Sequence, residues 1–176
     1  MAAEFPSALH RSLGIPADYA TRGLAFHAEA DPSDLVKVAN AADDLREVLL
    51  AARAADAWQR MCAAAAADGI ALLPLSGFRS IARQTEIIRT QLAAGRTIDD
   101  ILRTVAAPGF SEHHTGRALD LGAPGEPRLE EGFADTAAFG WLSRRAGEFG
   151  FWLSYPRGNA HGIAFEPWHW CWHQLR

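Results

Sequence analysis

Two short stretches rich in histidine and carboxylate groups constrain what this chain can fold into more than any other feature. Residues 111–120 read Ser-Glu-His-His-Thr-Gly-Arg-Ala-Leu-Asp, and residues 166–169 read Glu-Pro-Trp-His. Carboxylates at the ends of apolar strands cost free energy unless a cation meets them. We therefore expect the fold to bring the two stretches together, and we interpret them as one mononuclear zinc site with a general base beside it.

A catalytic zinc ion typically keeps three protein ligands and leaves one position open. Histidine nitrogens and carboxylate oxygens suit this ion, and the two stretches offer His113, His114, Asp120 and His169. An aspartate and two histidines would leave the ion with a net positive charge, which lowers the pKa of a water molecule. The residues alone leave open which of the adjacent histidines is a ligand. The alternative is a solvated histidine pair, with Asp120 capping a turn.

Two further charged residues are candidates for catalysis. Glu166 lies three residues before His169, so the backbone ties it to a predicted ligand, and Pro167 bends the chain between them. In that place Glu166 can act as a general base; the alternative is a surface ion pair. Arg79 follows a predicted strand and a glycine, and its guanidinium suits an oxyanion or a substrate carboxylate. The alternative for Arg79 is an exposed residue at the start of a helix.

The order of the predicted elements favours an α+β fold, because helices lead and strands close the chain. Apolar residues at helical spacing predict helices over residues 35–39, 42–68 and 81–94, a short helix opening at 97, and a helix over 136–149. Short apolar runs predict strands over residues 24–27, 70–75, 118–121, 151–155 and 162–165. We expect one globular domain, in which residues 1–34 form an irregular N-terminal leader packed on residues 35–176.

Composition narrows the classes of partner and compartment. The chain has 176 residues and a net charge of −4 without a basic patch, so nucleic acid is not an expected partner. No window approaches the roughly 18 consecutive apolar residues of a membrane span. The N-terminus lacks the pattern of an export signal, so we expect a cytoplasmic monomer, or a periplasmic or extracellular protein if a leader has been removed. Two cysteines, Cys62 and Cys171, cannot form a disulfide framework.

The motifs and their order resemble the VanY-type D-alanyl-D-alanine carboxypeptidases. The resemblance rests on Ser-Gly-Phe-Arg-Ser at 76–80 with Gln84, on Ser-x-His-x-x-Gly-x-Ala-x-Asp at 111–120 and on Glu-Pro-Trp-His at 166–169. It covers about residues 35–172. The chain departs from the family pattern after His169: family members often continue with an arginine and an aromatic residue, where this chain has Cys171 and Trp172.

The resemblance implies a fold and a metal. The implied fold is a small single α+β domain whose central antiparallel sheet carries the zinc site, with helices packed on the sheet. The implied cofactor is one catalytic Zn²⁺. The resemblance favours His113 over His114 as a ligand, together with Asp120 and His169. Residues 35–176 would then be the zinc carboxypeptidase domain.

The resemblance also implies roles and an activity. Glu166 is the implied catalytic base and Arg79 the implied stabiliser of the developing oxyanion, while Ser111 and Gln84 occupy positions that hold the substrate's terminal carboxylate. The expected reaction removes a C-terminal D-amino acid, D-Ala, from a peptidoglycan-type peptide. Alternatives in the same superfamily are a D,D-dipeptidase, an L,D-carboxypeptidase and an endolysin-type stem-peptide peptidase. A zinc-binding recognition module without turnover is the alternative of another class, and the intact Glu166 argues against it.

Overall fold

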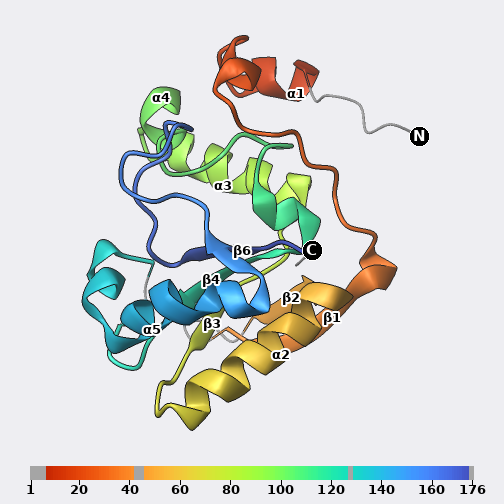
Figure 1. Cartoon of the computed structure of the whole chain (residues 1–176). Coiled ribbons are helices and arrows are strands. Elements are labelled where there is room, and N and C mark those ends of the chain that lie inside the picture. Colours follow the sequence, from red (N-terminus) through yellow and green to blue (C-terminus); the bar gives the residue numbers. More distant parts are fainter. Residues whose placement is uncertain (1–6, 42–45, 127–128, 175–176) are drawn as a thin grey trace.

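A four-stranded antiparallel sheet lies at the centre of the molecule (Figure 1). The computed structural model describes residues 7–41, 46–126 and 129–174. Within them the sheet has the order β3-β4-β6-β5, formed by β3 (Leu73–Ser76), β4 (Ala118–Gly122), β6 (His169–Trp172) and β5 (Phe151–Leu153). The mixture of this sheet with separate helices confirms the predicted α+β class.

One face of the sheet packs on two helices, α2 (Ala52–Ala67) and α5 (Ala137–Arg145). Apolar side chains of β4 and β6, including Leu119, Leu121 and Trp170, join buried residues of both helices in one hydrophobic cluster. Because side chains alternate along a strand, the other face of β4 and β6 is left for polar residues. The sequence thus separates a helical core from a polar face on the same sheet.

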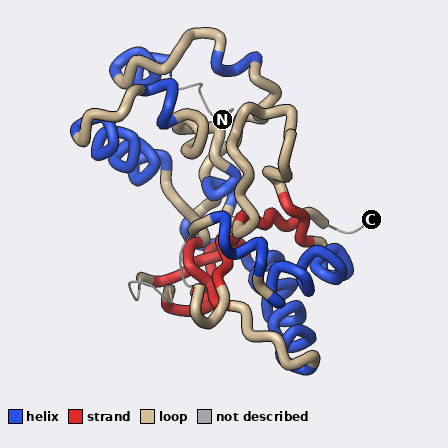
Figure 2. Tube along the Cα trace, turned by 90° about the vertical axis from the view of Figure 1, so that its left-hand side faces the viewer, coloured by secondary structure: helices blue, strands red, loops and turns tan. Residues whose placement is uncertain are grey.

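A second hydrophobic cluster lies around α3 (Ile81–Ala93) and α4 (Ile98–Ile101), away from α2 and α5 in both views (Figures 1 and 2). The N-terminal segment, with α1 (Ser7–Ser12), adds Leu13, Ile15 and Tyr19 to this cluster, where they meet Ile88 and Phe110. The helices predicted at 81–94 and from 97 are confirmed, and side chains of Ser80 and Thr97 cap their N-termini. Short 3-10 helices complete the chain at Tyr19–Thr21, Pro32–Asp34, Glu112–Thr115, Glu131–Asp135 and Ala146–Phe149.

A small two-stranded antiparallel sheet replaces part of the predicted helices. The helix expected at 35–39 is wrong, because β1 (Leu35–Asn40) occupies these residues, and β2 (Glu47–Ala51) occupies part of the helix expected at 42–68. Residues 42–45 of that expected helix lie outside the described residues. β-branched Val36, Val38 and Val48 favour extended backbone, which the helical spacing of the apolar residues concealed.

Two expected strands are also wrong. Residues 24–27 and 162–165 are irregular, and the last strand of the sheet begins only at His169. Pro167 has no backbone N–H to donate to a ladder. The irregular segment before Pro167 is held by isolated hydrogen bonds instead of a ladder: Ala164 N donates to Arg103 O at 2.7 Å, and Glu166 N donates to Tyr155 O at 3.1 Å.

The helix expected over 136–149 is divided into α5 and a 3-10 turn. In the part of the chain described here, no helix is long and apolar enough to cross a bilayer.

Candidate metal centre

The central sheet places two of the predicted ligands opposite each other. Asp120 on β4 is paired in register with His169 on β6. Asp120 shares its face of β4 with Ala118, while Leu119 and Leu121 point into the helical core. The pair is almost fully withdrawn from solvent, with Asp120 2% and His169 3% exposed.

His113 reaches the same place from a loop. It lies in the 3-10 turn Glu112–Thr115, which ends at Gly116 with a φ of 65°. A Cβ at Gly116 would lie 2.9 Å from a backbone nitrogen of β2, so a glycine is needed here. His113 Nδ1 lies 2.6 Å from the carbonyl oxygen of Gly77, which can only accept, so Nδ1 carries the proton. The other nitrogen, Nε2, is then unprotonated, so its lone pair can bind a metal ion; it lies 3.2 Å from an oxygen of Asp120.

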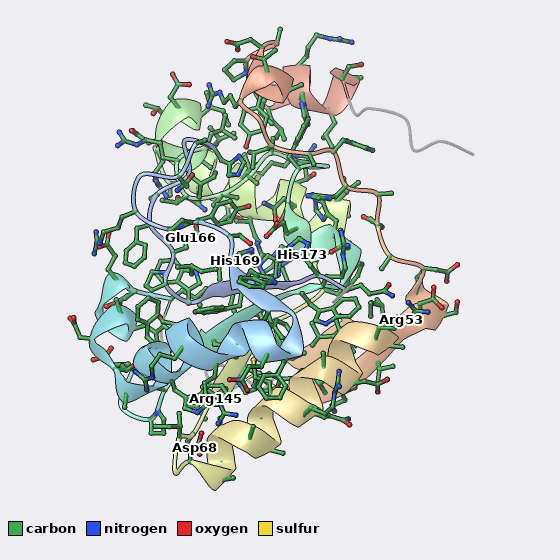
Figure 3. All side chains as sticks on the ribbon, viewed as in Figure 1. Arg53, Asp68, Arg145, Glu166, His169 and His173 are labelled. Carbon is green, nitrogen blue, oxygen red and sulfur yellow. The ribbon has the colours of Figure 1, made fainter. Side chains whose placement is uncertain are left out.

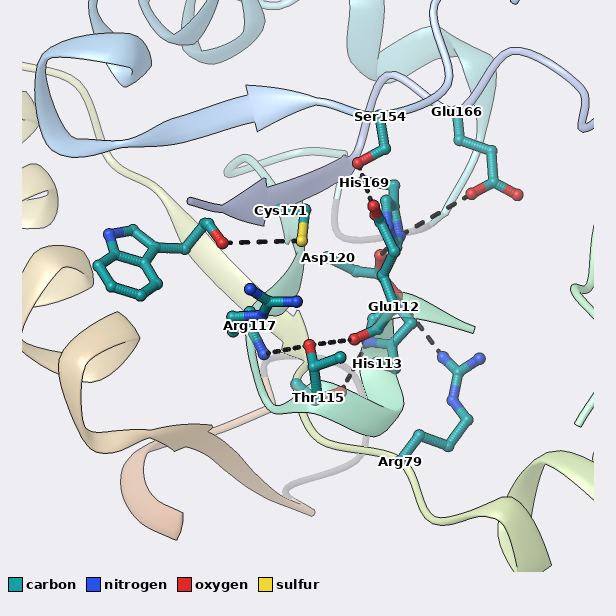
Figure 4. A network of polar contacts seen from close by, with 12 residues as sticks. Arg79, Glu112, His113, Thr115, Arg117, Asp120, Ser154, Glu166, His169 and Cys171 are labelled. Carbon is teal, nitrogen blue, oxygen red and sulfur yellow. Dashed lines mark hydrogen bonds and ion pairs between the residues drawn. The ribbon is translucent and has the colours of Figure 1, made fainter. Parts of the chain in front are cut away.

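His113, Asp120 and His169 form a buried group whose potential ligand atoms all lie within 4.8 Å of one another (Figure 4). His169 Nδ1 lies 3.0 Å from the second oxygen of Asp120. Bonds of about 2.0–2.2 Å to a tetrahedral zinc ion place the ligand atoms about 3.3–3.6 Å apart. The separations of 3.2 and 3.0 Å between Asp120 and the two imidazoles lie within a few tenths of an ångström of this range. Two imidazoles and a carboxylate so placed fit a zinc ion with one open position.

The charges in this group prepare it for a cation. Burial would raise the pKa of Asp120, but the neighbouring His113 and His169 hold that pKa well below its ordinary value. Burial would lower the pKa of His169, but hydrogen bonds to Asp120 and Glu112 raise it to about 10. Without a metal, a proton on His169 neutralises the anionic oxygens. Binding of a divalent ion would therefore release that proton.

His114 points away from this group although it adjoins His113. Its Nδ1 lies 2.6 Å from Arg79 O, and its Nε2 accepts from Gly109 N at 3.1 Å. Burial lowers the pKa of His114 to about 4, so the ring is neutral at pH 7. Both ring nitrogens of His114 are hydrogen-bonded to backbone groups. His114 therefore holds in place the segment that carries Arg79.

Glu112 is a site residue that the sequence interpretation missed. Its Oε2 lies 2.9 Å from His169 Nε2 and accepts from Ser154 Oγ at 2.5 Å (Figure 4). Burial raises the pKa of Glu112, but the contacts with His169 outweigh it and lower the pKa to about 2. A histidine ligand commonly gives its second N–H to a carboxylate. The position of Glu112 directly before His113 was the only signal available in the sequence.

The side chain of Glu166 lies beside the His113–Asp120–His169 group but is not part of it. Its Oε2 lies 4.0 Å from His169 Nδ1, and its side chain is nearly buried. His169 N donates to Glu166 O at 3.1 Å, so the bend at Pro167 aims both side chains into one cavity. Figure 3 shows the two side chains in the middle of the molecule, and Figure 4 marks the contact between them. Burial raises the pKa of Glu166 to about 7, which is suited to exchanging a proton near neutral pH.

Arg79, on the loop after β3, faces the His113–Asp120–His169 group. Its Nη2 lies 3.7 Å from an oxygen of Asp120 and 3.2 Å from Ser76 Oγ. Its Nη1 donates to Gln84 Oε1 at 3.1 Å, and Gln84 Nε2 donates to Ala106 O at 2.7 Å. Gln84 therefore holds Arg79 in place, while its expected contact with the substrate carboxylate stays a prediction.

All seven predicted site residues line one cavity of about 360 Å³. Ser111 is part of its wall and is 4% exposed. Tyr155, which was not predicted as a site residue, also lines the cavity, and its ring centroid lies 4.9 Å from that of His169. The apolar part of the wall includes Ile87, Leu129 and Ile163. The cavity thus joins a polar metal centre to an apolar mouth.

A sequence profile of a known family, described as VanY, D-alanyl-D-alanine carboxypeptidase, matches residues 47–175. The chain belongs to the VanY family. Among the curated relatives, YodJ of Bacillus subtilis (strain 168) is 34% identical over 146 residues, which make up 79% of this chain and 53% of YodJ. This VanY-family chain therefore spans about half the length of that relative.

Solved structures of two carboxypeptidase-like proteins share this fold. The LD-carboxypeptidase LdcB superposes with a TM-score of 0.71 at 32% sequence identity, over 81% of this chain and 69% of LdcB. A variant of the vancomycin resistance D,D-pentapeptidase VanY from a VanB-type cassette, in complex with Zn(II), gives a TM-score of 0.60 at 26% identity, over 86% of each chain. The predicted resemblance to the VanY family is confirmed, and one structural neighbour holds zinc.

Proposed function

We propose that the chain is a zinc metallopeptidase that removes the C-terminal D-amino acid, D-Ala, from peptidoglycan-type peptides. The observation that carries this proposal is the buried His113–Asp120–His169 group with Glu166 beside it in one cavity. The donor set is that of an open zinc site, which a catalytic ion needs. When bound there, zinc supplies Lewis acidity that polarises the substrate carbonyl and lowers the pKa of water.

Glu166 is proposed to move the proton. Its carboxylate takes a proton from the attacking water and later gives it to the leaving amine, which is the work of a general base and then a general acid. Burial raises the pKa of Glu166 from 4.5 to about 7 in the metal-free chain, so its carboxylate is a stronger proton acceptor than an exposed glutamate. A recognition module without turnover would have no use for such a buried carboxylate.

Arg79 is proposed to stabilise the negative charge that develops on the carbonyl oxygen. Its guanidinium is held by Ser76 and Gln84 before substrate arrives, so little reorganisation is needed in the transition state. Ser111 is proposed to contact the terminal carboxylate of the substrate. Gln84 then affects the substrate through Arg79 as well as through any contact of its own.

The substrate proposed here is a D-Ala-terminated peptide, of which only the end enters the cavity. A cavity of about 360 Å³ lies near the lower limit for small-molecule sites, roughly 300–1,000 Å³. It has room for the terminal residues, while the remainder of a stem peptide would lie across the apolar mouth. We propose that the protein acts as a monomer, since all seven site residues come from one chain.

The likeness to LdcB favours an L,D-carboxypeptidase as the second candidate, because removal of D-Ala from a tetrapeptide uses the same chemistry. The zinc-loaded protein should be incubated separately with a stem pentapeptide, a stem tetrapeptide and the D-Ala-D-Ala dipeptide, and free D-Ala measured. Release from the pentapeptide alone supports the D,D-carboxypeptidase, release from the tetrapeptide the L,D-enzyme, and release from the dipeptide a dipeptidase. Peptide cleavage elsewhere, with no D-Ala released, would indicate an endolysin-type peptidase, and binding without any cleavage would overturn the proposal.

A further inference from the structure

The face of β6 that carries His169 continues past the metal centre. Cys171 and His173 follow at every second residue, and side chains at this spacing share one face of an extended chain. The backbone remains extended beyond the strand, where His173 N donates to Gly150 O at 2.8 Å. Cys171 is 1% exposed, while His173 is exposed. A buried thiol and a solvent-facing imidazole therefore stand next to each other, beyond the His113–Asp120–His169 group.

Glu112 joins these two residues from the neighbouring loop. The potential ligand atoms of Glu112, Cys171 and His173 all lie within 4.8 Å of one another. The contacts of Glu112 to His169 and Ser154 both use Oε2, and the same carboxylate accepts a hydrogen bond from the Cys171 thiol. A cation that replaced the thiol proton would therefore lie between Cys171 and Glu112. Figure 4 shows Cys171 on the strand that carries His169, above Glu112.

We propose that Glu112, Cys171 and His173 form an outer binding site for a zinc-like transition-metal ion, separate from the His113–Asp120–His169 group. A thiolate, an imidazole and a carboxylate suit Zn²⁺ or Co²⁺, whereas Mg²⁺ and Ca²⁺ require oxygen ligands. Together the three ligands carry a charge of −2 once the thiol is deprotonated, which balances a divalent ion. Exposed His173 gives the ion a path from solvent and leaves its fourth position to water.

Several features make the outer site weaker than the inner one. Burial and the negative charge of Glu112 raise the pKa of the Cys171 thiol, so a metal ion must displace its proton. The positive charge of Arg117 lowers this pKa in part, but it also disfavours a second cation nearby. An ion held at His113, Asp120 and His169 would add to the repulsion. Burial lowers the pKa of His27, which interacts electrostatically with Glu112 and His173, and the neutral ring adds no positive charge to the outer site. The two sites should therefore fill in order, inner before outer.

The test is a titration of the metal-free protein with Co²⁺, because a thiolate bound to Co²⁺ gives a charge-transfer absorption that imidazole and carboxylate ligands do not. The first equivalent should bind without this absorption, since the inner group contains no sulfur. The second equivalent should bind more weakly and produce the absorption. Equilibrium dialysis with Zn²⁺ should likewise give two ions per chain.

Three variants assign the ligands. Cys171→Ser should bind one Co²⁺ and lose the thiolate absorption, while Cys62→Ser, which alters the other cysteine on α2, should behave as the parent. His173→Gln changes an exposed side chain, so it remains informative if Cys171→Ser does not fold. It should weaken the second equivalent by at least roughly tenfold, the scale on which supporting groups change metal affinity. One Co²⁺ per chain with no thiolate absorption in the parent, or an absorption that survives in Cys171→Ser, would overturn the proposal, whether or not the protein proves to be a peptidase.

Discussion

Glu112 Oε2 lies 2.9 Å from Nε2 of His169, the ring nitrogen opposite the one that faces Asp120. The contact fixes which nitrogen carries a proton and turns the other toward the metal centre. Ser154 in turn donates to the same carboxylate oxygen and holds it in place. A carboxylate outside the ligand group can therefore set the affinity of that group for zinc.

The variant Glu112→Gln tests this relationship. The amide keeps the shape of the side chain but carries no charge, so His169 becomes a weaker ligand. We expect zinc affinity to fall roughly 10- to 100-fold, measured by competition with a chromophoric chelator. Glu148→Gln, which removes a surface carboxylate paired with Arg145, is the matched control and should keep the parent affinity. Equal affinities in the two variants would contradict the positioning role of Glu112.

Removal of the proposed base, Glu166, should lower kcat without affecting folding or zinc binding. Glu166→Gln keeps most hydrogen bonds but cannot accept a proton, so kcat should fall by at least about 10²-fold while zinc content and folding are retained. Loss of zinc from this variant would instead identify Glu166 as a ligand.

The pH dependence of the parent enzyme should report the same group. Glu166 acts as a base only when ionised, so activity should rise with pH through its pKa. Burial raises this pKa from 4.5 to about 7 in the metal-free chain, and a bound cation pulls it back down, so the acidic limb should lie between these values. Because Glu166 titrates together with its ionisable neighbours, the midpoint of the acidic limb is a property of all of them. The limb should change or vanish in the residual activity of Glu166→Gln. A limb of unchanged midpoint in that variant would exclude Glu166 as its source.

Arg79 is expected to act in the transition state. Arg79→Ala should lower kcat by roughly 10²–10³, the usual scale for losing one such donor, and Arg79→Lys should rescue only in part. Gln84→Ala should give a smaller loss in kcat, because it frees the guanidinium without removing it. Arg83→Ala, which breaks a surface pair with Glu86, is the control. A raised KM with normal kcat in Arg79→Ala would mark a ground-state carboxylate binder instead.

His114 should make the fold sensitive to acid. Its pKa is about 4 in the fold and near 6.5 in the unfolded chain, so the unfolded chain binds more protons between these values. Stability is then fully present above about pH 6.5 and is lost as the pH falls toward 4, by at most roughly 3 kcal/mol. Denaturant unfolding of the metal-free protein at several pH values measures this loss. His114→Asn, which can still donate to Arg79 O but does not titrate, should lose less stability over the same range.

Much of the site could be predicted because its residues lie in compact motifs. Asp120 and His169 each sit on a strand, and the alternation of apolar and polar residues on β4 already placed Asp120 opposite the helical core. The contact between Glu112 and His169 could not be predicted, because it depends on the register between β4 and β6 and on the turn at Gly116. The place of Glu112 directly before His113 was the one signal in the sequence, and it does not say which residue the glutamate contacts.

The prediction of the fold was wrong where the local sequence is compatible with both a strand and another structure. Val36 and Val38 are compatible with a helix by apolar spacing and with a strand by β-branching, and only pairing with β2 decides between them. The run at 162–165 is as apolar as a strand, yet Pro167 and the bond from Ala164 N to Arg103 O keep it out of the sheet. Long-range pairing, which local pattern does not contain, settled both cases.

The N-terminal segment sets a practical limit on how far the chain can be shortened. The family profile begins at residue 47, but His27 N donates to Gly109 O and Ala30 N to His114 O, which secures the loop that leads to His113. A version trimmed to the profile boundary would lose these bonds, uncover Ile88 and Phe110, and leave β2 an unpaired edge. Expression for biophysical work should therefore retain residues 7–46, because a minimal fragment would be prone to self-association before its catalysis could be assayed.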